Sequence, residues 1–277
     1  MTGIHVFRHH AMATHFEVRL AGEDQPYAAQ AAQAAFARAD ELESHLSRFR
    51  ASSGIAQIAQ LTPGQALRLT GPVFACLEIA KKMEAATRGA FSVAAAALPS
   101  QSSTPQWTLL PETFSIRCDR GKLLFDLGAI GKGFARDRMA EILREWEWNA
   151  FLLVAGGSSI LAGAAPPGTP GWSCGLGDDN SPRRFSLEHA SLSGSGLAVK
   201  GQHILNPRTG HPAQRQNRAW ALCDTAAESD ALSTACMVLT ETEIAEVVAA
   251  EKSWLAILEE GPESFRFIGS RTKPDPA

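Results

Sequence analysis

Strand-like and helix-like segments follow one another in this chain without a regular alternation, and this order limits its fold more than any other feature. Residues 14–20 alternate between apolar and polar side chains, which predicts a strand. An alanine-rich stretch at 26–47, with Pro26 near its start, predicts a long helix. Because strands and helices mix without strict βαβ repetition, we expect an α+β fold with mixed sheets and packed helices.

Further elements follow from the same patterns. Apolar runs and bounding turn residues predict other helices, strands and two hairpins. With no internal repeat or break in composition, residues 1–277 are expected to form one domain, or two intertwined lobes. The expected segments are helices at 71–87, 132–146, 229–240 and 242–251, strands at 151–155, 172–177, 183–187 and 219–223, hairpins at 115–127 and 253–269, and a loop at 99–111.

Charge and cysteine content exclude several classes of protein. The formal net charge of −3 argues against a nucleic-acid partner, which needs a basic surface. The five cysteines are widely spaced and odd in number, which favours buried thiols over a zinc site or disulfides. No stretch approaches the roughly 20 apolar residues of a transmembrane segment. Without a signal peptide or lipobox the chain as given is expected to be cytoplasmic, although a trimmed exported form would look the same.

A glycine-spaced turn at 126–133 separates a predicted strand from a predicted helix. Free N–H groups and the positive end of a helix dipole favour a phosphate at such a turn. Lys132 adds a mobile cation at the same place. Taken alone, the segment favours a plain strand–helix turn with a surface lysine, because glycine-rich turns of this kind are common.

Asp230 and Thr234 are four residues apart in a predicted helix. They share one face, where a carboxylate and a hydroxyl can supply two hard oxygen ligands to Mg²⁺. The structural alternative is capping, in which Ser229 or Asp230 satisfies the first helical N–H groups.

The segment 203–212 predicts a rigid turn, because it contains Asn-Pro and Thr-Gly. His203 is a candidate base and Arg208 a candidate phosphate ligand. The alternative is a structured loop. Gly156 and Gly157, and later Ser193 and Gly194, suit close approach of a nucleotide or simple turns.

The order of these segments resembles that of the ApbE-type FAD:protein FMN transferases. The strongest similarities are H-I-L-N-P-R-T-G-H-P to the family's H-I-x-[DN]-P-x-T-G-x-P, and D-A-L-S-T-A to D-A-[LM]-[AS]-T-A. The D-L-G-A-I-G-K-G-F-A-R-D run is similar to the signature D-x-x-x-I-A-K-G-[YF]-x-x-D. Looser matches are A-M-A-T at 11–14, L-S-R-F at 46–49 and A-G-G at 155–157.

The resemblance implies an enzyme that splits FAD with Mg²⁺, releases AMP and attaches FMN to a Thr or Ser of an acceptor protein, within a Ser/Thr-Gly-Ala-Ser/Thr core. It implies His203 for proton handling and Lys132 beside the phosphates. The metal ligands implied are Asp230 and Thr234 through side chains and Ala129 through its carbonyl. The cofactor-binding residues expected are Met12, Thr14, Ala129, Lys132, Gly156, Gly157, Ser193, Gly194, Arg208 and Thr209.

The sequence departs from the family pattern where FAD contacts are expected. Gly54 and Ala59 stand where the family has an acidic residue and an Asn, and Ser92 replaces another acidic residue. Ser195 falls where the pattern has Asp or Asn, and no aromatic residue follows. The transferase interpretation therefore has an alternative: an FAD-binding module, or an FAD pyrophosphatase, that has lost protein flavinylation.

Overall fold

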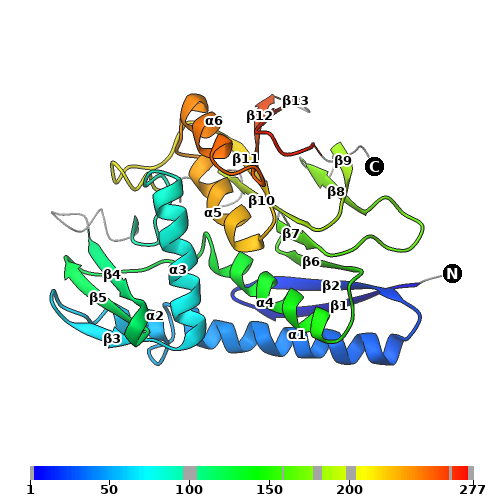
Figure 1. Cartoon of the computed structure of the whole chain (residues 1–277), viewed down its shortest axis with the longest axis horizontal. Coiled ribbons are helices and arrows are strands. Elements are labelled where there is room, and N and C mark those ends of the chain that lie inside the picture. The colour runs from blue at the N-terminus through cyan, green and yellow to red at the C-terminus, as the bar shows by residue number, and fades with distance from the viewer. Residues whose placement is uncertain are drawn as a thin grey trace.

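An eight-stranded sheet forms the centre of the molecule (Figure 1). The computed structural model describes residues 3–95, 105–157, 159–176, 183–197, 204–261 and 264–273. Each strand of the sheet is antiparallel to its neighbours. In spatial order the strands are β1 (Gly3–Ala11), β2 (Thr14–Gly22), β6 (Phe151–Ala155), β7 (Ser159–Ala162), β10 (Ala190–Gly196), β11 (Arg218–Cys223), β12 (Leu255–Gly261) and β13 (Ser264–Ile268).

Three helices cover one face of this sheet: α1 (Gln25–Leu46), α4 (Gly131–Glu145) and α5 (Ala226–Cys236) (Figure 1). The Asp24 side chain caps α1 by accepting a hydrogen bond from the Tyr27 N–H. The buried side of α1 is largely alanine, which lets α4 pack closely against it. Helices on an antiparallel sheet confirm the expected α+β class.

Alternation along the strands decides which side chains face the helices. In β2, Phe16, Val18 and Leu20 are fully buried in the main core beneath the helices. In β11, Trp220 and Leu222 point to the opposite face, into a second apolar cluster. The hairpin of β8 (Trp172–Leu176) and β9 (Arg183–Leu187) contributes to this cluster and covers that face of the sheet.

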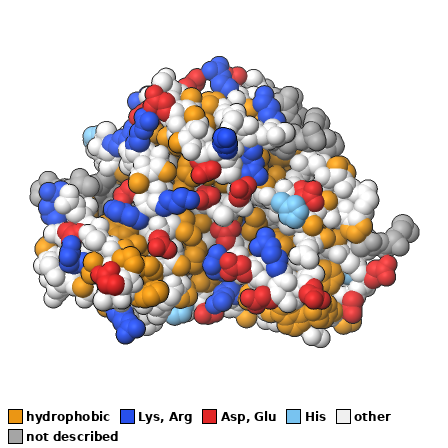
Figure 2. All heavy atoms as spheres, in the orientation of Figure 1, with side chains coloured by type: hydrophobic (Ala, Val, Ile, Leu, Met, Phe, Trp, Pro, Cys, Tyr) orange, Lys and Arg blue, Asp and Glu red, His pale blue; other side chains and the backbone are white. Residues whose placement is uncertain are grey.

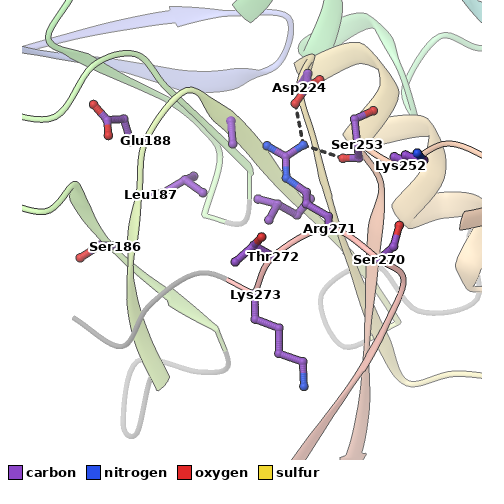
Figure 3. A pocket seen from close by; sticks show the side chains of 12 residues that line it. Ser186, Leu187, Glu188, Asp224, Lys252, Ser253, Ser270, Arg271, Thr272 and Lys273 are labelled. Carbon is purple, nitrogen blue, oxygen red and sulfur yellow. Dashed lines mark hydrogen bonds and ion pairs between the residues drawn. The ribbon is translucent and has the colours of Figure 1, made fainter.

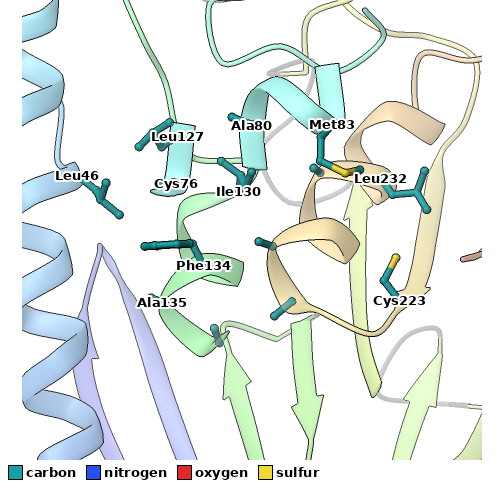
Figure 4. Close-up of a cluster of buried hydrophobic side chains, with 14 of the residues drawn as sticks. Leu46, Cys76, Ala80, Met83, Leu127, Ile130, Phe134, Ala135, Cys223 and Leu232 are labelled. Carbon is teal, nitrogen blue, oxygen red and sulfur yellow. The ribbon is translucent and has the colours of Figure 1, made fainter. Parts of the chain in front are cut away.

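The main core continues between α4, α5 and α3 (Gly71–Ala86) (Figure 4). Ile130 and Phe134 lie between Leu46 at the end of α1 and Leu232 of α5. Met83 of α3 lies beside Leu232 of α5 at the edge of this cluster. The start of α4 therefore lies in an apolar cluster to which α1, α3 and α5 also contribute.

A three-stranded sheet, in the order β3 (Ala66–Arg68), β5 (Ser115–Arg120) and β4 (Gln106–Leu110), lies at one end of the molecule near α2 (Gly54–Ile58) (Figure 1). The expected hairpin at 115–127 is wrong, because β5 pairs with β3 and β4 and residues 123–127 form no strand. The expected loop at 99–111 is wrong at 106–110, where burial of Trp107 against Phe125 holds β4 in place. A 3₁₀ turn at Pro111–Thr113 follows, and 99–104 lie outside the described residues.

Most other expected elements are confirmed, with one shifted helix. The helix predicted at 229–240 begins at Ala226, because Thr225 caps its N-terminus by accepting a hydrogen bond from the Glu228 N–H. It ends at Cys236. The next helix, α6 (Glu241–Ala249), starts in a complete capping box between Thr240 and Glu243. All five cysteines are buried and free, as expected. None of the helices in the described part of the chain has the length and apolar character to cross a membrane.

Candidate active site

The turn before α4 places a helix N-terminus and a lysine at one spot. The Gly128 N–H donates to Asp126 Oδ1 at 2.9 Å, and the Lys132 ammonium donates to the Gly128 carbonyl at 2.7 Å. Ile130 occupies the N-cap position, and within the described chain no side chain caps this end of α4. An uncapped helix N-terminus beside a cation suits an anionic ligand. Ala129 belongs to the same turn, with its side chain half-buried.

The tip of the β1–β2 hairpin reaches this turn. Met12 and Ala13 link the paired residues Ala11 and Thr14 and have φ angles of 51° and 57°. Such left-handed values at two residues without glycine are uncommon, and the Met12 N–H is held by Glu43 Oε2 at 2.8 Å. A Cβ atom at Gly131 would lie 3.6 Å from Met12 Cε. Met12 therefore packs against the first residue of α4.

Thr14 and Gly156 lie side by side where β2 begins and β6 ends. The Gly156 N–H donates to the carbonyl of His15 at 3.0 Å. A Cβ atom at Gly156 would lie 3.3 Å from Thr14 Oγ1, and its φ of 62° also favours glycine. At Gly157 the described structure offers nothing within 4 Å of such a Cβ, so this backbone is open to a ligand.

Asp230 is bound to Arg136, a residue to which the sequence motifs assign no role. The Arg136 Nη2 atom donates to Asp230 Oδ1 at 2.7 Å and to Ser193 Oγ at 3.1 Å. The Arg136 side chain is 0% exposed and that of Asp230 is 6% exposed. Asp230 therefore does not cap α5, and the capping alternative is wrong, since Thr225 caps this helix.

Hydroxyl groups continue this polar layer between α5 and β10. The Ser193 Oγ lies 2.7 Å from the Ser229 Oγ, and the Ser195 Oγ lies 3.2 Å from the Thr234 Oγ1. The Thr234 hydroxyl donates to the carbonyl of Asp230 at 3.1 Å. The structure thus brings Ser193, next to Gly194, together with both predicted side-chain metal ligands.

The donor set at Asp230 fits a cation that is held only partly by the protein. Asp230 Oδ2 is buried and has no hydrogen-bond partner among the described residues, and the Thr234 hydroxyl is its neighbour one helical turn away. No cluster of three or more His, Cys, Asp or Glu side chains that could hold a metal occurs in the described ranges. One carboxylate with hydroxyl and carbonyl oxygens matches Mg²⁺ sites that are completed by substrate phosphates.

Asp137 joins α4 to α5, and its role was missed in the sequence. Its two oxygens accept from the Ala226 and Ala227 N–H groups at 2.7 and 2.9 Å. Burial raises the pKa of Asp137 to about 6, although these two hydrogen bonds oppose the shift. The helices touch nearby, because a Cβ atom at Gly133 would lie 2.2 Å from the Ala226 carbonyl oxygen. The final Asp of the D-x-x-x-I-A-K-G-[YF]-x-x-D pattern was the available signal.

Arg208 and Thr209 lie in the expected rigid turn, where Leu205 pairs with Pro212. The Arg208 guanidinium donates to Glu243 Oε1 at 2.6 Å and to the carbonyls of Arg88 and Thr87. In this structure all three guanidinium nitrogens of Arg208 are bound within the protein, and its role as a phosphate ligand stays a prediction. The Thr209 hydroxyl accepts from His211 N–H and stabilises the turn. His203 lies outside the described residues.

A separate surface hollow lies away from these residues. It has a volume of about 550 Å³, lies near the start of β10 and beyond the end of β13, and is lined by polar residues such as Asp224, Ser253 and Arg271 (Figure 3). The Arg271 guanidinium is bound to Asp224 and to the Ser253 carbonyl (Figure 3). None of the predicted site residues that the structure describes lines it. On the face shown in Figure 2, acidic and basic side chains are interspersed.

Comparison with solved structures places this fold among flavin transferases. The flavin transferase ApbE from Vibrio cholerae superposes with a TM-score of 0.83 at 17% identity, covering 98% of both chains. The ApbE protein from Thermotoga maritima superposes with a TM-score of 0.80 at 20% identity, covering 96% of this chain and 97% of the other.

The ApbE family matches residues 12–258, and the chain therefore belongs to the ApbE family. The FAD:protein FMN transferase of Escherichia coli K12 is 24% identical over 162 residues, covering 53% of this chain and 46% of the relative. That of Haemophilus influenzae is 29% identical over 147 residues, covering 48% and 42%. These alignments span roughly half of the length of the curated relatives.

Proposed function

We propose that this chain is a Mg²⁺-dependent FAD:protein FMN transferase. The observation that carries the proposal is the convergence of separate sequence segments. Met12 contacts the start of α4, Arg136 of α4 binds Asp230 of α5, and Thr234 of α5 contacts β10. These are the segments whose order resembles the family, and the curated relatives carry this name.

In the proposed reaction the hydroxyl oxygen of an acceptor Ser or Thr attacks the FMN-side phosphorus of FAD. A new P–O bond forms, the P–O bond of the diphosphate bridge breaks, and AMP leaves with the bridging oxygen. The hydroxyl proton passes to a base, for which His203 is the candidate. Bound Mg²⁺ neutralises the charge that develops on the diphosphate.

The chain's own groups supply binding and orientation. The uncapped start of α4 and the Lys132 ammonium bind the phosphates. Asp230, Thr234 and the Ala129 carbonyl would hold the cation, and Thr14, Gly156 and Gly157 would border the nucleotide.

An assay of nucleotides and peptide tests this function. The protein is incubated with FAD, Mg²⁺ and a peptide bearing a Ser/Thr-Gly-Ala-Ser/Thr core, with and without EDTA. We expect EDTA-sensitive AMP release in step with a peptide that gains the mass of FMN. If neither AMP nor modified peptide forms, the transferase proposal fails.

A second candidate, an FAD-binding module or FAD pyrophosphatase, rests on Gly54. A Cβ atom at this residue would lie 2.9 Å from Val73 Cγ2, so the acidic residue of the family pattern would have to displace the Val73 side chain. Intact FAD retained on the protein would indicate the binding module. FMN and AMP without modified peptide would indicate the pyrophosphatase.

A further inference from the structure

Arg136 is a buried charge whose hydrogen-bonded carboxylate is the predicted metal ligand Asp230. Its Nη2 atom binds Asp230 Oδ1 and Ser193 Oγ, and its Nε atom lies 3.4 Å from the Lys132 carbonyl. A buried guanidinium needs a partner, because removing a charge from water is costly. The pair therefore ties α4, α5 and β10 together at the site.

The pair is joined through one oxygen and one nitrogen, although guanidinium and carboxylate groups can form two parallel bonds. Arg136 Nη1 and Asp230 Oδ2 are both buried, and neither has a hydrogen-bond partner in the described structure. Ser193 takes the second contact of Nη2, and Ser193 is itself fixed by Ser229. This arrangement holds the carboxylate by Oδ1 and leaves Oδ2 for another ligand.

The charges around this carboxylate favour an anion over a free cation. Arg136 pairs with Asp230, and Lys132 carries a second positive charge one turn earlier on α4, whereas the neighbouring Asp137 carboxylate is held by two backbone N–H groups of α5. A divalent cation would meet little net negative charge here, whereas a diphosphate would bring negative charge with it. We propose that Arg136 is a positioning residue that orients Asp230 and makes divalent-cation binding dependent on the nucleotide diphosphate.

This inference rests on the proposed metal role of Asp230, and its test needs no turnover. Mn²⁺ serves as the probe, and its binding to the nucleotide-free full chain is measured by electron paramagnetic resonance. We expect weak binding by the wild type and binding at least about tenfold tighter by Arg136→Gln, which keeps a polar group but loses the charge. Arg136→Lys restores the charge and is expected to bind as weakly as the wild type.

Arg138→Gln is the matched control, because it makes the same change of charge two residues along α4, where the guanidinium binds Glu141. We expect its Mn²⁺ affinity to equal that of the wild type. Circular dichroism verifies that each variant is folded. Equal Mn²⁺ affinity of the wild type and a folded Arg136→Gln variant would overturn the inference.

If Arg136→Gln does not fold, a second measurement, on the wild type, still tests the inference. Linkage requires that Mn²⁺ strengthens FAD binding by the factor by which FAD strengthens Mn²⁺ binding. We expect FAD to bind at least about tenfold tighter with Mn²⁺ than with EDTA, measured by stopped-flow flavin fluorescence and corrected for Mn²⁺–FAD complexes in solution. If Mn²⁺ leaves the FAD affinity unchanged, the inference about Arg136 is overturned. If the acceptor peptide is not modified in the separate assay, only the transferase proposal fails.

Discussion

Glu243 and Asp137 are two carboxylates whose environments move their pKa values in opposite directions. Hydrogen bonding from the Thr240 N–H, and then from Arg208, lowers the pKa of Glu243 to about 2. Burial raises the pKa of Asp137 to about 6. Both anchor a helix N-terminus, so their titration connects pH to the stability of α6 and α5.

The Glu243→Gln variant is expected to be less stable than the wild type by about 1 kcal/mol at pH 7, because it weakens a capping box and an ion pair. The lowered pKa means that the folded state binds fewer protons, so this stabilisation exists above pH 4.5 and is lost as pH falls toward 2. Urea unfolding at pH 7, 5 and 3 should show the difference shrinking with acid. The Arg208→Met variant, which keeps the capping box, should lose less stability at pH 7 than Glu243→Gln. A difference that stays constant down to pH 3 contradicts this account.

Asp137→Asn should show the opposite dependence on pH. The raised pKa means that the folded wild type binds more protons than the unfolded chain between pH 3.8 and about 6, so its stability from this group falls as pH rises. The free energy of unfolding of Asp137→Asn, relative to the wild type, should therefore rise by about 1–3 kcal/mol from pH 4 to pH 7. Urea unfolding of both proteins at these two pH values measures it, and a fall of the relative value would count against the burial of Asp137.

At the scale of elements, the crossing of α4 and α5 positions the site. The backbone of Gly133 lies against Ala226, so the two helices approach more closely than side chains would allow. This contact places Arg136 opposite Asp230. The glycine of the K-G-F-A-R-D run therefore has a packing role between helices, in addition to any role near a ligand.

Gly133→Ala is expected to separate α4 from α5 and to lower the free energy of unfolding by about 1–3 kcal/mol. Gly71→Ala, at the start of α3, is the matched control, because the described structure has nothing within 4 Å of its added Cβ. The control should be neutral or slightly stabilising. Thermal unfolding compares the melting temperatures of the two variants. Equal melting temperatures would mean that the contact between α4 and α5 accommodates the added methyl group without loss of stability.

Periodicity predicted the elements that bury one face. The alternation at 14–20 and the alanine-rich helix at 26–47 correspond to β2 and α1. The β1 strand was missed because its turn at Met12 and Ala13 has left-handed φ angles without glycine or asparagine, so no turn signal exists. The hairpin at 115–127 was wrong because β5 pairs with segments distant in the sequence, which local turn residues do not encode.

At the scale of the whole molecule, the order of motifs predicted the family, and contacts between distant helices decided the chemistry of the site. Asp230 and Thr234 share one face of α5, as their spacing predicted. The buried pair of Arg136 and Asp230 could not be predicted, because a charged residue on a helix usually faces solvent. Residues 94 positions apart meet there only through the tertiary fold.

The proposed reaction requires Asp230 when the diphosphate of FAD is broken, and AMP release by variants of α5 tests this role most directly. Asp230→Asn is compared with Glu228→Gln, which makes the same chemical change two residues away, where the carboxylate binds Lys82. Chromatography of the nucleotides, with Mg²⁺ and the acceptor peptide present, measures the rates, and circular dichroism verifies folding. We predict at least a roughly hundredfold loss in Asp230→Asn and a rate near that of the wild type in Glu228→Gln. Equal AMP release by folded Asp230→Asn and the wild type would contradict the account.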